Sequence, residues 1–412
     1  MALAGGGGTD WGFMVIGVAG SLASFFTLLW AVFEPKARAS KTFSGLVGLL
    51  LLWIWVSVGQ AVYLKEAWLW AGIWTATLGL GWSIHLLARE KTLSYFHGVF
   101  FVSSVLVLTI SWFEWQAIPL PFENILIPNP KSTAITGPYF NAAHFGGYLV
   151  FNNAFLMGTL LLRKFDALSL LSIPLLVYSN WVLMQTDSSS IPVALLMLPL
   201  MILLWVISKN WKWGVFLSGI TVLASILGVL FFNTPQGQAI FQANKQTIGL
   251  SNSWPKFIEG REAVWSYGER MWADAPWTGL GIGQFSILSA SYRNDPRETQ
   301  ASVDRQFVNY AHSDYLQMLS EVGIIGLALF LLLNASVILL GLIKRKPAAL
   351  IAAGSAVGYL ITGIYDSHIT FIPATMLIFY AFMGLAYAEN RQVNNLMVDS
   401  GTNSRKPALT ER

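Results

Sequence analysis

Long apolar runs alternate with short polar connections along most of the chain. A helix needs about twenty apolar residues to cross a bilayer, because its backbone groups must all be paired internally there. We expect eleven transmembrane helices, at 11–33, 42–63, 67–88, 94–117, 143–162, 167–185, 191–207, 213–233, 322–343, 348–365 and 370–388. The pattern therefore predicts an all-α, polytopic membrane protein with about 11–12 transmembrane helices.

One long polar segment, 234–321, separates the eighth predicted span from the ninth and holds Arg, His, Asp, Glu and Trp close together. The chain thus divides into helices over 1–233, this loop, helices over 322–390 and a polar tail over 391–412. The tail is rich in Asn, Ser, Thr and Lys, which predicts disorder.

The loop contains two helical patterns. Apolar and aromatic residues recur at helical spacing from Phe257 to Ala273, which predicts an amphipathic helix ending at Asp274-Ala275-Pro276. The glycines between Gly279 and Gly283 predict a tight bend. A second pattern starts near Tyr315 and runs into the next span, so we expect His312 in the first turn of that helix.

Composition agrees with a lipid environment. The chain is 55% hydrophobic and 11% charged, whereas soluble domains average about 25% charged residues. The net charge of +4 is better explained by orientation and anionic lipid than by nucleic acid, which we do not expect as a partner. With no Cys, disulfides and thiolate metal sites are excluded. The Gly-rich start lacks a basic segment, so no cleavable signal peptide is expected.

The charges also predict the topology. Alternate connections and the tail carry sixteen of the 25 Lys and Arg residues, whereas the four short connections between them carry only Lys65 and Lys131. The positive-inside rule then places the C-terminus in the cytoplasm and 234–321 in the periplasm. An odd number of spans would put the N-terminus outside as well.

His312 is the strongest candidate catalyst in the loop. An imidazole can take a hydroxyl proton near neutral pH, and Tyr310, Ser313 and Asp314 are close enough in sequence to orient it. A lone His in such a loop is more often a hydrogen-bonding surface residue, and that alternative stays open.

Arg261 follows Gly260 and opens the predicted amphipathic helix. Its planar guanidinium can bind phosphate oxygens in bidentate fashion, and free N–H groups at a helix start would support the same ligand. The alternative is an Arg that contacts lipid headgroups. The loops on this side contain no His-x-Glu, Glu-x-x-His or Asp-x-Asp, so neither a metal nor another cofactor is expected.

Three stretches resemble the bacterial O-antigen ligase and polymerase superfamily, which includes protein O-oligosaccharyltransferases. One is Gly260-Arg261 with the following Gly279-Leu-Gly-Ile-Gly bend and Phe285. The second is His312-Ser313, nine residues, then Gly323-Ile-Ile-Gly326. The third is a looser match that includes Asn141 and His144. Where the family often has Ser-Arg after a middle span, this chain reads Asp187-Ser188-Ser189-Ser190.

The resemblance implies a metal-independent, inverting glycosyltransferase of the inner membrane. It implies that His312 is the catalytic base and that Arg261 engages the pyrophosphate of an undecaprenyl-linked glycan at the periplasmic face. Lipid A–core or a growing glycan is the implied acceptor. Residues expected near the donor or substrate are Gly260, Tyr310, Ser313, Asp314, Asn141, His144 and Ser188. A polymerase or a protein O-oligosaccharyltransferase remains an alternative. A transporter is disfavoured because carboxylates are nearly absent from the predicted spans.

Overall fold

The fold is built from α-helices and short 3-10 turns. The computed structural model describes residues 22–23, 25–27, 40–87, 90–118, 134–139, 141–162, 166–186, 188, 190–209, 212, 234–236, 254–293 and 308–403. Within these ranges there is no β-strand, which agrees with the predicted all-α class. The helices are α2 Lys41–Val58, α3 Leu64–Leu87, α4 Glu90–Trp115, α6 Ala142–Leu162, α7 Ala167–Gln185, α8 Ile191–Lys209, α11 Trp254–Asp274, α12 Phe285–Leu288, α14 Asp314–Lys344, α15 Pro347–Thr362 and α16 Pro373–Asn403, with 3-10 turns η2 Gly137–Tyr139 and η3 Ser289–Tyr292.

Nine of the eleven predicted spans overlap helices of the described ranges. The predicted span 213–233 and most of 11–33 lie outside those ranges. Five described helices are long and apolar enough to cross a membrane, at Lys41–Val58, Tyr95–Trp115, Ala142–Leu162, Ala167–Gln185 and Asp314–Lys344. The chain is therefore a multi-pass membrane protein.

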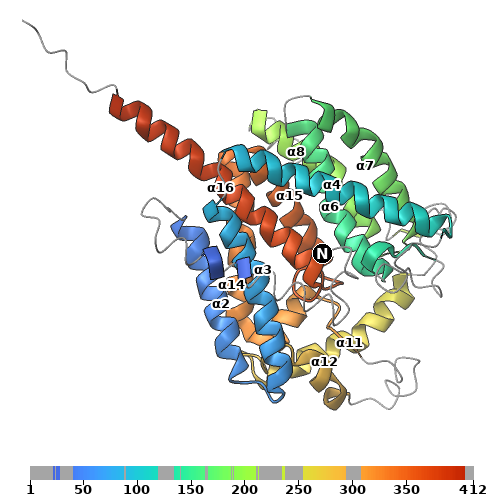
Figure 1. Cartoon of the computed structure of the whole chain (residues 1–412). Helices are drawn as coiled ribbons and strands as arrows, with labels where there is room; N and C mark the ends of the chain where they lie inside the picture. The colour runs from blue at the N-terminus through green and yellow to red at the C-terminus, as the bar shows by residue number, and fades with distance from the viewer. Residues whose placement is uncertain are drawn as a thin grey trace, which may run out of the picture.

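The helices form one bundle in which small residues allow close packing (Figure 1). Helix α16 packs along α3, where a Cβ on Gly384 would lie 1.9 Å from the carbonyl oxygen of Gly81. Helix α6 lies in the interior and contacts α15, where a Cβ on Gly158 would lie 2.1 Å from Ile351. Such small-residue contacts are typical of helix packing in membranes. Lipid tails are as apolar as the side chains, so helices associate through close van der Waals packing and not through the hydrophobic effect.

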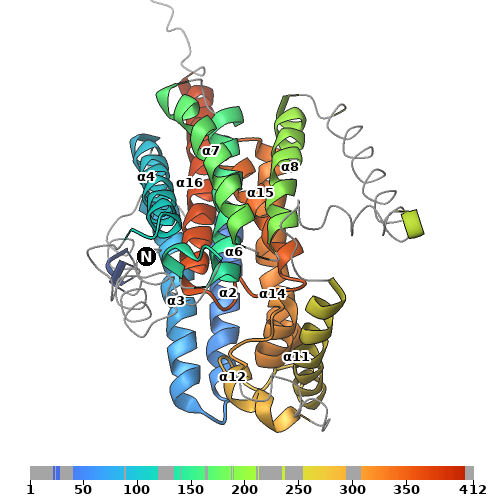
Figure 2. The same ribbon diagram turned by 90° about the vertical axis from the view of Figure 1, so that its right-hand side faces the viewer.

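Connections that the charge pattern assigns to one side lie at one end of the bundle. The α2–α3 turn contacts the glycine bend through Tyr63 and Gln284. At the opposite end, the Ser40 N–H donates to His85 and the Ala348 N–H donates to Glu389. Figure 2 shows α11 and α12 beside α2, α3 and the first part of α14, away from α7 and α8. The alternation predicted from Lys and Arg is thus consistent with the arrangement of the helices.

The C-terminal tail departs from its prediction. Helix α16 continues to Asn403, so 391–403 is helical where the composition predicts disorder, and 404–412 lie outside the described ranges. Extending an existing helix avoids the cost of nucleating a new one, which explains how a polar sequence can stay helical after a buried segment.

Helix α14 is interrupted at Gly323, where φ is 66° and ψ is −173°. The break frees backbone carbonyls, and the glycine bend and α2 supply donors for them. The Leu280 N–H donates to the Ser320 oxygen, the Gly281 N–H to the Glu321 oxygen and the Trp53 indole to the Val322 oxygen, at 2.9, 2.9 and 2.8 Å. The two glycine motifs separated in sequence therefore meet at this break.

Candidate functional site

Helix α11 carries Arg261, whose side chain is 13% exposed. The amphipathic helix and its end at Asp274 occur where the sequence predicts them. However, α11 begins at Trp254, so Arg261 lies inside the helix and not at its start. The predicted helix start at Arg261 is therefore wrong, and Arg261 is not surrounded by the free N–H groups of a helix start. Gly260 precedes Arg261 in the same helix.

His312 lies immediately before α14, not in its first turn. Ser313 is the N-cap, with extended backbone and a side chain that accepts from the Leu316 N–H, so the helix starts at Asp314. His312 has φ 51°, a left-handed conformation that few non-glycine residues adopt. The Trp265 indole donates to the His312 carbonyl oxygen at 3.2 Å. Trp265 is one helical turn after Arg261, so one face of α11 reaches both Asp366 and His312.

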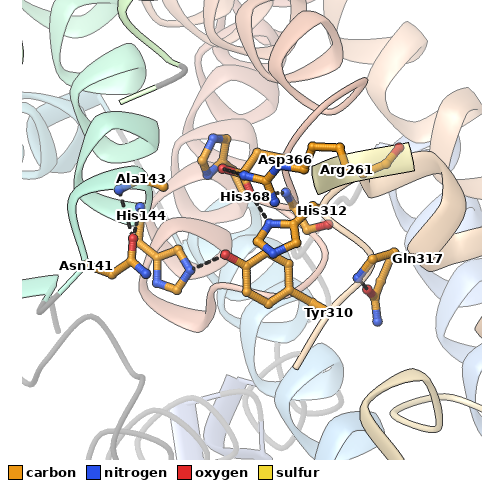
Figure 3. A network of polar contacts seen from close by, with 12 residues as sticks. Asn141, Ala143, His144, Arg261, Tyr310, His312, Gln317, Asp366 and His368 are labelled. Carbon is orange, nitrogen blue, oxygen red and sulfur yellow. Dashed lines mark hydrogen bonds and ion pairs between the residues drawn. The ribbon is translucent and has the colours of Figure 1, made fainter. Parts of the chain in front are cut away.

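Asp366 joins the two predicted residues (Figure 3). Its Oδ1 lies 3.4 Å from His312 Nδ1, and its Oδ2 lies 3.8 Å from Arg261 Nη2. The Asp366 side chain is fully buried, whereas those of His312 and Arg261 are 25% and 13% exposed. His312 and Arg261 thus remain accessible to a ligand, whereas the carboxylate that links them is not.

Asp366 and the nearby His368 were not among the predicted site residues. Both occupy the turn between α15 and α16, which the sequence marks only as a polar connection on the same side as the long loop. The assignment of this turn and the long loop to the same side was the one feature of the sequence that could have indicated their contact. Nothing in the local spacing indicated contact with His312.

Tyr310 and His144 form the other wall of the site. The Tyr310 hydroxyl lies 2.9 Å from His144 Nε2, and the Tyr310 ring lies 4.1 Å from the His312 ring, centroid to centroid. Phe371 stacks on Tyr310 and on Trp70 of α3, with centroids 4.7 Å apart in both pairs. These stacked rings hold Tyr310 in place, so two predicted residues do gather beside His312.

Ser313 and Asp314 hold the Asp366 turn. The Ser313 hydroxyl donates to the Gly363 oxygen at 3.0 Å, and the Asp314 N–H donates to the same oxygen at 2.8 Å. Asp314 Oδ1 accepts from the Thr370 N–H and hydroxyl. Both side chains are buried. Ser313 and Asp314 therefore use their described hydrogen bonds to hold the turn that carries Asp366.

Asn141 and Ser188 also make local contacts. Asn141 Oδ1 accepts from the Ala143 and His144 N–H groups at the start of α6. Ser188 accepts from the Ser190 N–H at 3.1 Å and lies against Gly146. Ser188 is therefore linked to the site only indirectly, through the bond between Ser190 and His368. Lys131 lies outside the described ranges.

Ser190 Oγ and His368 Nε2 lie 3.2 Å apart, and Gly147 of α6 packs on the imidazole of His368. Burial lowers the pKa of His368 from 6.5, although the nearby Asp366 opposes this shift. Burial also raises the pKa of Tyr310 well above 10, and the charge of Asp366 adds to that shift. Both groups are therefore uncharged near neutral pH.

The arrangement can orient a base. A carboxylate that accepts the Nδ1–H of an imidazole leaves Nε2 with a free lone pair. Within the described residues, no three His, Asp or Glu side chains are grouped so as to hold a metal ion. Pyrophosphate leaving groups need stabilisation of negative charge, which a guanidinium can supply.

A sequence model described as O-antigen ligase matches residues 174–331, a segment that contains both Arg261 and His312. This match supports membership of the chain in the O-antigen ligase superfamily. No curated protein matches it at a significant level. Membership supports a membrane glycosyltransferase of the O-antigen ligase type, with lipid-linked glycan and lipid A–core as the general substrate classes. The matched segment ends before Asp366 and begins after His144, so the family match covers only part of the site.

Proposed function

We propose that this chain is an inverting, metal-independent O-antigen ligase of the inner membrane. It moves a glycan from undecaprenyl pyrophosphate to lipid A–core, or onto a growing glycan, at the periplasmic face. The observation that carries the proposal is the position of Asp366, 3.4 Å from His312 and 3.8 Å from Arg261. This position supports the proposal, because it brings the imidazole proposed as the base and the guanidinium proposed to bind phosphate to the same carboxylate, and both side chains are partly exposed.

The reaction follows from these positions. Asp366 accepts the Nδ1–H of His312, and His312 Nε2 takes the proton of the acceptor hydroxyl. The hydroxyl oxygen forms a bond to the anomeric carbon on the face opposite the pyrophosphate, which inverts the configuration. The bond between that carbon and the pyrophosphate oxygen breaks, and the electron pair leaves with undecaprenyl pyrophosphate. Arg261 stabilises the negative charge of the leaving group.

The periplasmic face is supported by the distribution of cations. Lys344, Arg345 and Lys346 lie in the α14–α15 connection, and Lys41 begins α2. These groups are at the end away from His312, and the positive-inside rule assigns that end to the cytoplasm. A lipid-linked donor would then reach the site from the outer leaflet.

The test is glycan transfer by the purified protein. Undecaprenyl-pyrophosphate-linked glycan is mixed with lipid A–core, with a second portion of the same glycan, or with a periplasmic acceptor protein, and products are sized on gels. His312→Ala should lower transfer by about 10²- to 10⁴-fold, the usual contribution of a general base. Arg261→Lys should also be severe, because a point charge does not replace a planar fork.

Arg345→Lys is the matched control, since it makes the same change at an exposed residue of the opposite end. It should transfer glycan at the wild-type rate. Wild-type transfer by a folded His312→Ala protein would overturn the assignment of the base. The acceptor that is modified decides between a ligase, a polymerase and a protein O-oligosaccharyltransferase.

A further inference from the structure

The first half of α14 buries polar side chains that the reaction does not use. Asp314, Gln317 and Glu321 are 1%, 2% and 5% exposed. Gln317 and Glu321 are one helical turn apart and therefore share a face. Buried polar groups are costly unless they are paired, so their partners indicate what they do.

Gln317 uses both ends of its amide. Its Oε1 accepts from the Ala311 N–H at 2.7 Å, and its Nε2 donates to Glu321 Oε1 at 2.8 Å. Glu321 Oε1 also accepts from the Phe285 N–H at 3.1 Å. A continuous set of hydrogen bonds thus runs from the glycine bend to the residue before His312 (Figure 3 shows Gln317 beside His312).

These bonds fix the backbone on one side of His312, and α11 fixes it on the other. Gln317 holds the peptide group that contains the Ala311 nitrogen, and Trp265 holds the carbonyl oxygen of His312. The φ of 51° at His312 lies between these two anchored groups. A left-handed non-glycine residue persists only when its surroundings determine it.

We propose that Gln317 is a positioning residue that keeps His312 in its left-handed conformation, with Glu321 as the anchor of Gln317. The inference rests on the proposed role of His312 as the base. The competing explanation is that Gln317 and Glu321 only fasten the glycine bend to α14. In that case their loss would lower stability but leave the environment of His312 unchanged.

The test compares Gln317→Met, which is similar in size and makes neither amide bond, with Ser320→Ala. Ser320 is the matched control because its hydroxyl donates only to the Gln317 carbonyl oxygen of the same helix. We expect Gln317→Met to lower kcat by about 10- to 100-fold, since small misplacement of a reacting group has effects of this size. KM for donor and acceptor should change less than about twofold, because the Gln317 side chain is buried, at 2% exposed, and uses its amide for bonds within the protein.

A second measurement does not depend on glycan transfer. Diethyl pyrocarbonate modifies neutral imidazoles, and mass spectrometry of the His312 peptide gives its rate of modification against pH. Gln317→Met should shift that profile, and Ser320→Ala should reproduce the wild-type profile. If the wild-type protein transfers no glycan, the proposed function fails, while this measurement still decides whether Gln317 positions His312.

Glu321 supplies a pair of variants in case Gln317→Met does not fold. Glu321→Gln keeps an oxygen for the Phe285 N–H and for Gln317 Nε2, so it should retain wild-type kcat and the wild-type modification profile. Glu321→Leu removes that oxygen and should show the defect of Gln317→Met. The proposal is overturned if folded Gln317→Met or Glu321→Leu matches the wild type in both measurements, or if Ser320→Ala shows the same defect.

Discussion

Asp366 is the residue through which Arg261 and His312 depend on each other. Its carboxylate is fully buried, and a buried charge without partners is strongly unfavourable. Arg261 and His312 supply those partners at 3.8 and 3.4 Å. The carboxylate that Arg261 stabilises therefore also orients His312, the proposed base.

Asp366→Asn should leave the size of the side chain unchanged and remove its preference for the Nδ1–H tautomer of His312. By analogy with other carboxylate–imidazole pairs, kcat should fall by about 10²- to 10⁴-fold. Steady-state kinetics with varied donor and acceptor measure this. Asp166→Asn is the control, because Asp166 caps α7 and Asn caps helices equally well. Transfer by folded Asp366→Asn within about threefold of wild type would refute the role of the carboxylate.

His368 should make the protein less stable in acid. Its pKa in the folded protein is lowered from 6.5, so the unfolded chain binds more protons in the acid range and stability rises with pH. The free energy of unfolding that the neutral His368 contributes is complete above pH 6.5. It is lost as the pH falls through the lower pKa of the folded state. His368→Gln can still bond to Ser190 but does not titrate. Its unfolding temperature in detergent should therefore vary less between pH 7 and pH 5 than that of the wild type, and an unchanged slope would contradict the prediction.

At the residue scale, the sequence could identify the groups proposed to meet the ligand but not those that hold them in position. His312 and Arg261 are conspicuous because they occur in the one long polar segment of an apolar chain. Asp366 contacts His312 from a position 54 residues later in the chain. The spacing of residues near either one does not indicate such a long-range contact. The sequence correctly places Ser313 and Asp314 close to His312. Their hydrogen bonds to Gly363 and Thr370, however, hold the turn that carries Asp366.

At the scale of elements, the break in α14 sets the position of the site. The apolar run 322–343 predicts a single span, and helical spacing before it predicts an amphipathic start. Both patterns occur, but they belong to two helical segments on either side of Gly323. The change of direction could not be predicted, because one glycine in an apolar run is tolerated in a straight helix as well.

Gly323→Ala should be damaging. Its φ of 66° strains any other residue, and a Cβ would lie 2.3 Å from the Trp277 carbonyl carbon, which is backbone and cannot rotate away. We expect a loss of at least about 1–3 kcal/mol of stability, together with loss of transfer. Gly326→Ala should be milder, since its Cβ would meet the Val322 side chain.

Gly48→Ala is the control for both variants, because nothing lies within 4 Å of its Cβ position. In a helix this change should be neutral or stabilise by about 0.5–1 kcal/mol. Thermal unfolding and glycan transfer measure all three proteins. Equal stability of Gly323→Ala and Gly48→Ala would show that the break does not require glycine.

At the scale of the whole molecule, the described buried carboxylates Asp314, Glu321 and Asp366 gather at one end, and the described cations at the start of α2 and between α14 and α15 lie at the other. The alternation of charge could predict which connections share a side, since that rule concerns each connection separately. It could not predict that α6 is interior or that α16 lies along α3. Those neighbours are selected by small residues and polar pairs distributed over many helices.

The side of the membrane can be tested directly because the chain has no Cys. Gln60 is exposed in the α2–α3 turn, whose Tyr63 contacts the glycine bend, and Arg345 is exposed in the α14–α15 connection. In cells with a permeabilised outer membrane, a membrane-impermeant maleimide should label Gln60→Cys. It should label Arg345→Cys only after the inner membrane is broken. The reverse result would place His312 and Arg261 on the cytoplasmic side, where a periplasmic acceptor such as lipid A–core could not reach them, and the proposed reaction would have to be abandoned.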